Sequence, residues 1–137
     1  MRDVFHQVVK VALQKDGWTI THDPLSISSG GVNMAIDLGA EKMIAAEKDD
    51  VKIAVEVKSF LEYSSAISGF HMALGQFINY RGALRKEDPN RLLYLAVPLT
   101  TYNTFFQLDF PQWIMQENQV KLVIYEPESE VIVEWRE

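Results

Sequence analysis

The chain has 137 residues, which suits one domain with its own core, and its 47% hydrophobic and 23% charged residues exclude a disordered protein. The formal net charge of −6 excludes a protein that holds nucleic acid over a broad basic surface, so any DNA contact has to be local. The absence of cysteine excludes disulfides and thiolate chemistry. No apolar run approaches about 18 residues, so we expect one soluble cytoplasmic domain, residues 1–137, without membrane contact.

The first part of the chain predicts one helix followed by strands. Apolar side chains recur at helical spacing over residues 3–16, with Asp3 placed to cap the helix and Gly17 placed to end it. Alternating residues then favour strands, and the small residues 28–31 favour a loop. The expected strands are residues 18–21, 32–38, 41–48 and 51–60, with Asp49 and Asp50 as a tight hairpin turn.

The rest of the chain alternates helices and strands. A long amphipathic helix is expected over residues 65–86, with a buried stripe made of Phe70, Ala73, Leu74, Phe77, Ile78 and Leu84. The apolar run 92–98 is typical of a strand buried on both faces. Short helices at 102–107 and 111–118 and strands at 120–125 and 130–135, the last at a sheet edge, complete the pattern. This order predicts an α/β fold with a mixed central sheet flanked by helices.

The strand that begins near residue 51 carries charges on one face. With a period of two, Lys52, Ala54, Glu56 and Lys58 share a face, whereas the other face bears only β-branched residues. A carboxylate and an ammonium group therefore stand where a core would be expected. Two interpretations are open: an ordinary same-face ion pair, or a catalytic pair.

Two carboxylates and a lysine at this spacing suit a metal-dependent phosphodiesterase. Mg²⁺ and Mn²⁺ take oxygen ligands, and a nearby lysine can position the attacking water or stabilise charge on the phosphate. Asp37 and Glu56 are the candidate metal ligands, and Lys58 is the candidate catalytic lysine. Gln76 and Tyr80 lie four residues apart on one helix face and are placed to reach the same end of the sheet, or are ordinary packing residues.

The hairpin turn sets a geometric condition on Asp37. If residues 49–50 were the centre of a regular hairpin, the partner of Glu56 would lie six residues from Asp37. At about 3.3 Å per residue the separation is roughly 20 Å, which is too far for a shared metal. The strand is therefore expected to bend or bulge near Gly39, or else Glu41 replaces Asp37.

Several segments resemble known families. The order of Asp37, Glu56, Lys58, Gln76 and Tyr80 resembles the PD-(D/E)XK nuclease fold and its Gln-x-x-x-Tyr variants. More closely, nearly the whole chain is similar to the XisH family, which is named for controlling excision of the fdxN DNA element in cyanobacteria. The segments that carry this second resemblance are residues 5–10, 17–25, 36–42 and 74–81.

The resemblance implies a restriction-endonuclease-like fold and a role in site-specific DNA rearrangement. It implies DNA, a recombinase and a protein of the XisI family as partners, and Mg²⁺ or Mn²⁺ as the cofactor of an endonuclease site. One position departs from the pattern, because His6 stands where related nucleases often carry a glutamate in the first helix. The alternative is a non-catalytic regulatory or assembly protein that keeps the nuclease fold and binds the recombinase or an XisI-type partner.

Other polar groups have simpler interpretations. The basic cluster Arg81, Arg85, Lys86 and Arg91 suits either a local DNA contact or a solvated helix end that complements the helix dipole. The three histidines lack the spacing of metal ligands, which argues against zinc. Tryptophans such as those at 113 and 135 are typical of core or oligomer contacts, which leaves a homo-oligomer open. A different phosphate-bearing ligand in the pocket is a third hypothesis.

Overall fold

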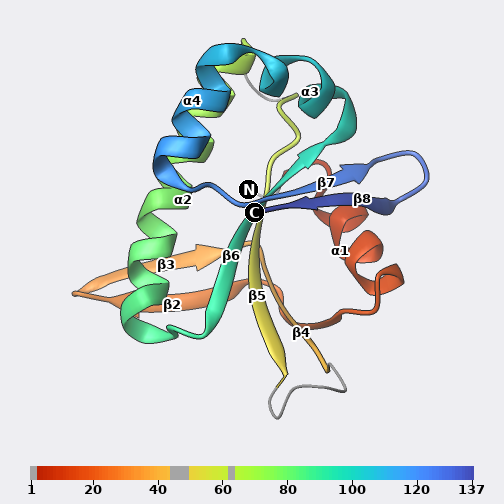
Figure 1. Ribbon diagram of the computed structural model, residues 1–137. Helices are drawn as coiled ribbons and strands as arrows, with labels where there is room; N and C mark the ends of the chain where they lie inside the picture. The colour runs from red at the N-terminus through yellow and green to blue at the C-terminus, as the bar shows by residue number, and fades with distance from the viewer. Residues whose placement is uncertain (1–2, 44–49, 62–63) are drawn as a thin grey trace.

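The computed structural model describes residues 3–43, 50–61 and 64–137 (Figure 1). The helices are α1 (His6–Lys15), α2 (Ala66–Glu87), α3 (Leu99–Asn103) and α4 (Asp109–Asn118), with a short 3-10 helix η1 (Phe105–Gln107). The strands are β1 (Thr19–His22), β2 (Leu25–Ser29), β3 (Val32–Ile36), β4 (Leu38–Lys42), β5 (Val51–Val57), β6 (Arg91–Pro98), β7 (Leu122–Glu126) and β8 (Val131–Arg136). Within these described ranges, no helix is both long and apolar enough to cross a bilayer.

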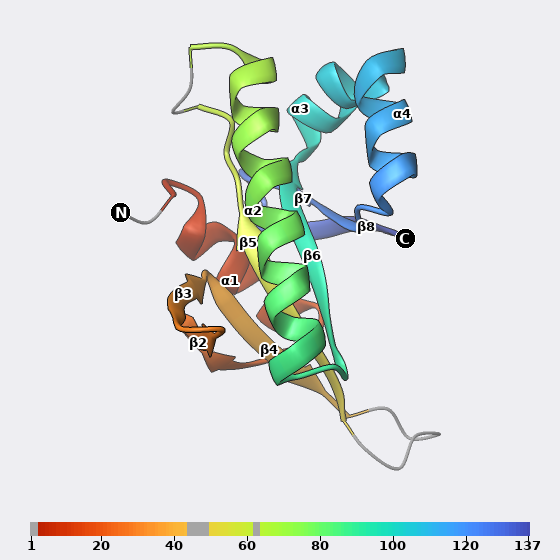
Figure 2. The same cartoon turned by 90° about the vertical axis from the view of Figure 1, so that its left-hand side faces the viewer.

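A six-stranded mixed sheet forms the centre of the molecule (Figures 1 and 2). Its order is β1-β4-β5-β6-β7-β8, with β5, β6 and β7 parallel and the other neighbours antiparallel. Helix α1 packs on one face and α2 on the other, while β2 and β3 form a separate hairpin beside α2. The predicted mixed sheet flanked by helices is confirmed, as is the edge position of the last strand.

Helix α2 is the crossover between the parallel strands β5 and β6. A tight turn cannot join parallel neighbours, so the chain has to cross one face of the sheet. The Ser65 hydroxyl starts the helix by accepting a hydrogen bond from the Ser68 N–H at 3.3 Å. Phe77 is buried as expected, but Ile78 is 40% exposed, because one helical step of about 100° turns it away from the sheet.

Helix α1 ends in a motif that the sequence indicates through Gly17. This glycine has φ +95°, a conformation that other residues rarely adopt. The Gly17 N–H donates to the Gln14 carbonyl and the Trp18 N–H donates to the Leu13 carbonyl, both at 3.0 Å. These two bonds form a Schellman motif that ends the helix and directs the chain into β1.

The register of β4 against β5 corrects the expected hairpin. Leu38 pairs with Val55 and Lys42 with Val51, so paired residues sum to 93 and not 99. Strand β4 ends at Lys42 and β5 begins at Val51, and the turn expected at 49–50 lies partly outside the described residues. The ladder is continuous across Gly39, so no bulge is needed there. The faces predicted for β5 are still correct, because they depend on the alternation within the strand and not on its register with β4.

Three other boundaries differ from expectation. Residues 25–29 form β2, although no strand was expected at 25–27 and a loop was expected over residues 28–31. Leu25 and Ile27 are buried and alternate with exposed serines, and the segment pairs with β3. The single strand expected over 32–38 divides at Asp37 into β3 and β4. The strand expected over 41–48 ends at Lys42, and its part over 44–48 lies outside the described residues. The strand buried on both faces is confirmed, since residues 93–98 are all buried.

Candidate active site

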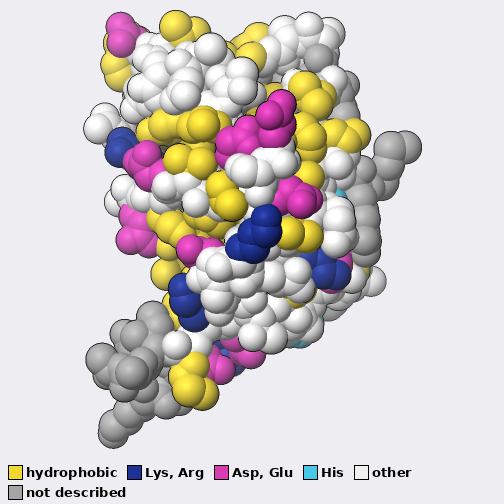
Figure 3. All heavy atoms as spheres, turned by 90° about the vertical axis from the view of Figure 1, so that its right-hand side faces the viewer, with side chains coloured by type: hydrophobic (Ala, Val, Ile, Leu, Met, Phe, Trp, Pro, Cys, Tyr) yellow, Lys and Arg dark blue, Asp and Glu magenta, His cyan; other side chains and the backbone are white. Residues whose placement is uncertain are grey.

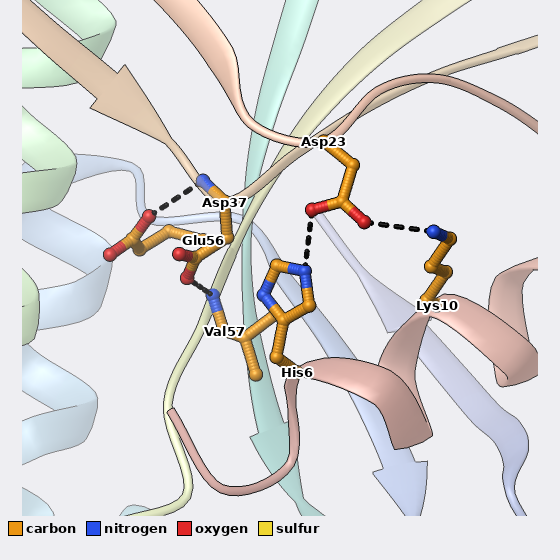
Figure 4. Close-up of polar contacts among 6 residues, drawn as sticks. All are labelled: His6, Lys10, Asp23, Asp37, Glu56 and Val57. Atoms are coloured by element: carbon orange, nitrogen blue, oxygen red, sulfur yellow. Dashed lines mark hydrogen bonds and ion pairs between the residues drawn. The ribbon is translucent and has the colours of Figure 1, made fainter. Parts of the chain in front are cut away.

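The strand register brings Asp37 and Glu56 together at one end of β5. Asp37 lies at the bend between β3 and β4, one residue before the Leu38–Val55 pair, which places it level with Glu56. The Asp37 N–H donates to Glu56 Oε1 at 3.2 Å, and the Val57 N–H donates to Asp37 Oδ2 at 2.8 Å (Figure 4). The Glu56 carboxylate is therefore bonded to the backbone of Asp37, and the Asp37 carboxylate is bonded to the backbone of Val57, the residue after Glu56. One oxygen of each carboxylate remains outside these two bonds.

Lys58 completes the group at the end of the same strand. Its Nζ lies 3.7 Å from Glu56 Oε2. Glu56 is only 5% exposed and Lys58 only 8%. The backbone of Lys58 is held on both sides, because its N–H donates to the Ala96 carbonyl at 3.0 Å and its carbonyl accepts from the Tyr125 hydroxyl at 3.1 Å. The lysine is thus fixed by the central strands rather than by a loop.

The pKa of Glu56 is raised from 4.5 to about 8, first by burial and then by the negative charge of Asp37. The ammonium group of Lys58 and the hydrogen bond from the Asp37 N–H act in the opposite direction and lower this pKa. Desolvation outweighs these favourable contacts because the carboxyl group has almost no access to water. Glu56 is therefore mostly protonated at neutral pH, and a cation bound beside it would favour the ionised form.

Helix α2 packs on the face of the sheet that Glu56 shares with Ala54, and it contributes Tyr80 and Gln76. Burial, followed by the charges of Glu56 and Asp37, raises the pKa of Tyr80 to about 12, so its hydroxyl stays protonated and can donate near the pair. Gln76 lies one turn earlier on the same helix face. Its Oε1 is buried and finds no hydrogen-bond partner in the described chain. A carbonyl oxygen left in this state suits a water or a cation.

A second polar group, which the sequence did not indicate as functional, lies beside the pair. His6 is 4% exposed, and its Nε2 lies 2.7 Å from Asp23 Oδ1, while Lys10 Nζ donates to Asp23 Oδ2 at 2.8 Å. Burial alone would raise the pKa of Asp23, but the contacts with Lys10 and His6 outweigh it and lower that pKa. The His6 Nδ1 is buried without a partner in the described chain. Figure 4 shows the imidazole ring with Asp23 on one side and Asp37 and Val57 on the other.

One signal for this group was present in the sequence. His6 and Lys10 are four residues apart, so they share a face of α1 and can hold one carboxylate between them. The partner, Asp23, could not be chosen without the fold, because the strand β1 lies between α1 and this residue. The other histidines, His22 and His71, are exposed.

The donor set at the pair fits a hard divalent cation with water in its coordination shell. In the described part of the chain, no three His, Asp or Glu side chains are grouped closely enough to hold a metal by themselves. Asp37 and Glu56 offer carboxylate oxygens and Gln76 offers an unpartnered carbonyl oxygen. Mg²⁺ commonly binds through one or two carboxylates and keeps several waters, which suits this set better than a closed cage would.

The predicted residues separate into those that meet and those that do not. Asp37, Glu56 and Lys58 form one group in which Glu56 and Lys58 are buried and Asp37 is partly buried. Tyr80 is close enough for both carboxylates to raise its pKa. The reserve carboxylate Glu41 is wrong, because it pairs with Lys52 at the far end of the strand, where its Oε1 lies 3.8 Å from Lys52 Nζ. Whether the group is catalytic stays a prediction.

The chain matches one protein-family model and is similar to proteins of known structure. Residues 1–133 match the family model described as XisH protein. The chain is similar to the crystal structure of an XisH family protein from Nostoc punctiforme PCC 73102, with 67% identity and a TM-score of 0.91 over 98% of this chain and 100% of that chain. It is also similar to an fdxN element excision controlling factor protein from Anabaena variabilis, with 66% identity and a TM-score of 0.89 over 99% and 100% of the two chains. No curated protein matches the chain.

Proposed function

The chain belongs to the XisH family, and on that premise we propose that it controls the excision of a DNA element and acts on DNA through a restriction-endonuclease-like site. The similar protein from Anabaena variabilis is described as an fdxN element excision controlling factor, which supports the first part. The second part is carried by one observation, the pairing of Asp37 with the buried Glu56 beside Lys58.

The proposed reaction is hydrolysis of a phosphodiester bond, in which water attacks phosphorus and the sugar oxygen leaves with a proton. Asp37 and Glu56, with the Gln76 carbonyl, would hold Mg²⁺ or Mn²⁺. When bound, the cation supplies positive charge to the phosphate oxygens. Lys58 orients the attacking water and stabilises charge on the phosphate, because its ammonium group lies in a site with little water. Tyr80 donates a hydrogen bond from a hydroxyl that stays protonated.

A cleavage assay with a matched lysine control tests this proposal. Duplex, nicked and branched DNA are incubated with the protein and Mn²⁺, and we expect Lys58→Ala to lower the cleavage rate by about a hundredfold or more. Lys52→Ala removes a lysine from the same strand and face but from its exposed end, and it should cleave as the parent does. If Lys58→Ala still cleaves at the parent rate, Lys58 has no part in the mechanism. If no DNA substrate is cleaved by the parent protein, the proposed endonuclease activity is wrong.

Metal binding gives a readout that does not depend on turnover. Mn²⁺ should raise the melting temperature of the parent protein, and this rise should be lost in Asp37→Asn and reduced in Gln76→Leu. Glu134→Gln, on the exposed edge strand, serves as the control for loss of one carboxylate. An equal shift in all four proteins would show that the cation binds elsewhere.

The second candidate is a regulatory or assembly protein that uses the same fold without cleavage. It is favoured by the net charge of −6 and by the bonds of Asp37 and Glu56 to backbone N–H groups, which hold the β3–β4 bend against β5. A pull-down would then recover a recombinase or an XisI-type protein in stoichiometric amount. Unaltered excision in the double variant Asp37→Asn/Glu56→Gln would favour this candidate. If this variant loses excision but still binds the partner, the endonuclease is favoured.

A further inference from the structure

A second polar site lies on the other flank of helix α2. A cavity of about 580 Å³ is enclosed by α2, α4, the starts of β6 and β7, and the end of β8. These elements adjoin one another on one side of the molecule in Figure 2. Phe77, Leu84, Leu93, Met115 and Leu122 give it an apolar floor. Because Phe77 lies about 100° around the helix from Gln76, the cavity does not share the face that holds the carboxylate pair.

The cavity concentrates positive charge in an acidic protein. Five cations line it against one carboxylate: Arg81, Arg85, Arg91, Lys121 and Arg136 against Glu137. Because the whole chain has a formal charge of −6 and these six residues contribute +4, the remainder carries −10. On the face that bears α1 and the β7–β8 hairpin, basic side chains are interspersed with acidic and hydrophobic ones (Figure 3). A local positive cavity in a negative molecule attracts anions by focusing the field.

Two of the cations already have structural partners. Arg91 donates to Asp88 Oδ2 and to the Ile53 carbonyl, both at 2.9 Å, so it fixes the start of β6. Arg81 donates to the carbonyl groups of Asn118 and Gln119 at the end of α4. These two guanidinium groups hold the walls of the cavity in place.

The remaining cations are available to a ligand. Within the described chain, Arg85 and Lys121 have no side-chain hydrogen bond or ion pair, and Arg136 contacts only Glu134 through an exposed pair. The pKa of Arg81 is lowered, first by burial and then by the positive charge of Arg85. The like charges therefore oppose one another, and a bound anion would relieve that repulsion.

We propose that this cavity binds a nucleoside phosphate, with the phosphate on Arg85 and Lys121 and the base on the apolar floor. The volume falls within the range of small-ligand sites, roughly 300–1,000 Å³. Gln112, Gln116 and Gln119 also line it, and amide side chains can donate to and accept from the edge of a base. Phosphate, apolar ring and hydrogen-bonding edge are the three parts of a nucleotide, and each has a matching group here.

The same chemistry is offered by a free nucleotide and by the 5′-phosphorylated end of a DNA strand. Isothermal titration with AMP, ADP and a 5′-phosphorylated trinucleotide distinguishes the two sources. A mononucleotide that binds as tightly as the trinucleotide identifies the free nucleotide. Tighter binding of the trinucleotide, lost when its 5′ phosphate is removed, identifies a strand end.

Charge reversal next to a matched control tests the site itself. Arg85→Glu and Lys121→Glu should each weaken ADP or trinucleotide binding by roughly tenfold or more, since each removes a charge-assisted contact. Lys86→Glu changes the net charge equally and lies one residue from Arg85 on an exposed part of α2, but it does not line the cavity, so binding should stay within about twofold. Circular dichroism checks that each variant is folded.

The outcomes separate this proposal from the active site. Asp37→Asn/Glu56→Gln should bind the same ligand with unchanged affinity, because that pair lies on the other face of α2. The proposal is overturned if neither AMP, ADP nor the trinucleotide binds, or if Lys86→Glu weakens binding as much as Arg85→Glu does. Loss of binding in the double carboxylate variant would also overturn it, by moving the ligand to the carboxylate pair.

Discussion

The two flanks of helix α2 hold polar groups in opposite ways. On one flank, Glu56 and Lys58 are buried and Asp37 is partly buried, and hydrogen bonds of the strand backbone hold this group in place. On the other flank, Arg85 and Lys121 line the cavity, and neither side chain has a hydrogen bond or an ion pair within the described residues. This difference shows that a site held by the backbone hydrogen bonds of a sheet keeps its geometry only while the sheet is folded. A site lined by helix side chains can be altered with little effect on the stability of the fold.

The largest effect is expected from removing the buried carboxyl group. Glu56→Ala leaves the Asp37 N–H without its acceptor and opens a cavity beside Lys58, so the free energy of unfolding should fall by about 2–4 kcal/mol. Urea unfolding measures it. Glu134→Ala on the exposed edge should cost less than about 1 kcal/mol. An equal loss in both variants would contradict the structural role of the buried group.

The pH dependence of stability should follow the same residue. Because the folded pKa of Glu56 is about 8 and its ordinary value is 4.5, the folded state binds more protons between these values. Its contribution is complete below about pH 4.5 and is lost as pH rises through 8, at about 1.4 kcal/mol per pKa unit, so the loss is of order a few kcal/mol. Urea unfolding at pH 6 and 9 should show this loss in the parent and not in Glu56→Gln. A parallel slope in both proteins would assign it to another group.

A smaller loss is expected at the neighbouring His6 contact. His6→Ala removes a buried ring and its bond to Asp23, which should lower stability by roughly 2 kcal/mol. Lys10→Ala removes the other contact of Asp23 from a more exposed side chain and should cost about half as much or less. Thermal unfolding gives both values, and a larger effect from Lys10→Ala would show that the ion pair, and not the buried ring, stabilises this corner.

The helix flank should respond less. Arg81→Ala removes the donors to the α4 carbonyls and should cost about 1 kcal/mol. Arg85→Ala removes a side chain without a bonded partner and should change stability by no more than about 0.5 kcal/mol. Denaturation midpoints of the two variants sharpen the comparison, because a large effect at Arg85 would mean that the cavity is part of the core.

The fold was predictable wherever local pattern and tertiary packing agree. The faces of β5, the length of α2 and the burial of residues 93–98 in β6 followed from periodicity, because burial on one face or on both leaves a direct mark on residue order. Leu92, at the start of the predicted run, is 42% exposed. The hairpin register was wrong because β4 ends at Lys42 and β5 begins at Val51, and strand alternation does not encode where two strands pair. The strand β2 was missed because its alternation is short, and its pairing with β3 is decided by the fold.

By itself the sequence determined the charged face of β5 and the candidate pair Glu56 and Lys58, since spacing along one strand fixes which side chains share a face. Only the tertiary structure decided that Asp37 is the carboxylate opposite Glu56 and that His6 lies beside it. It also gathered Arg85 and Lys121 around one cavity. The reason is that contacts between distant segments depend on register and packing, which are set by the whole chain rather than by any one stretch of it.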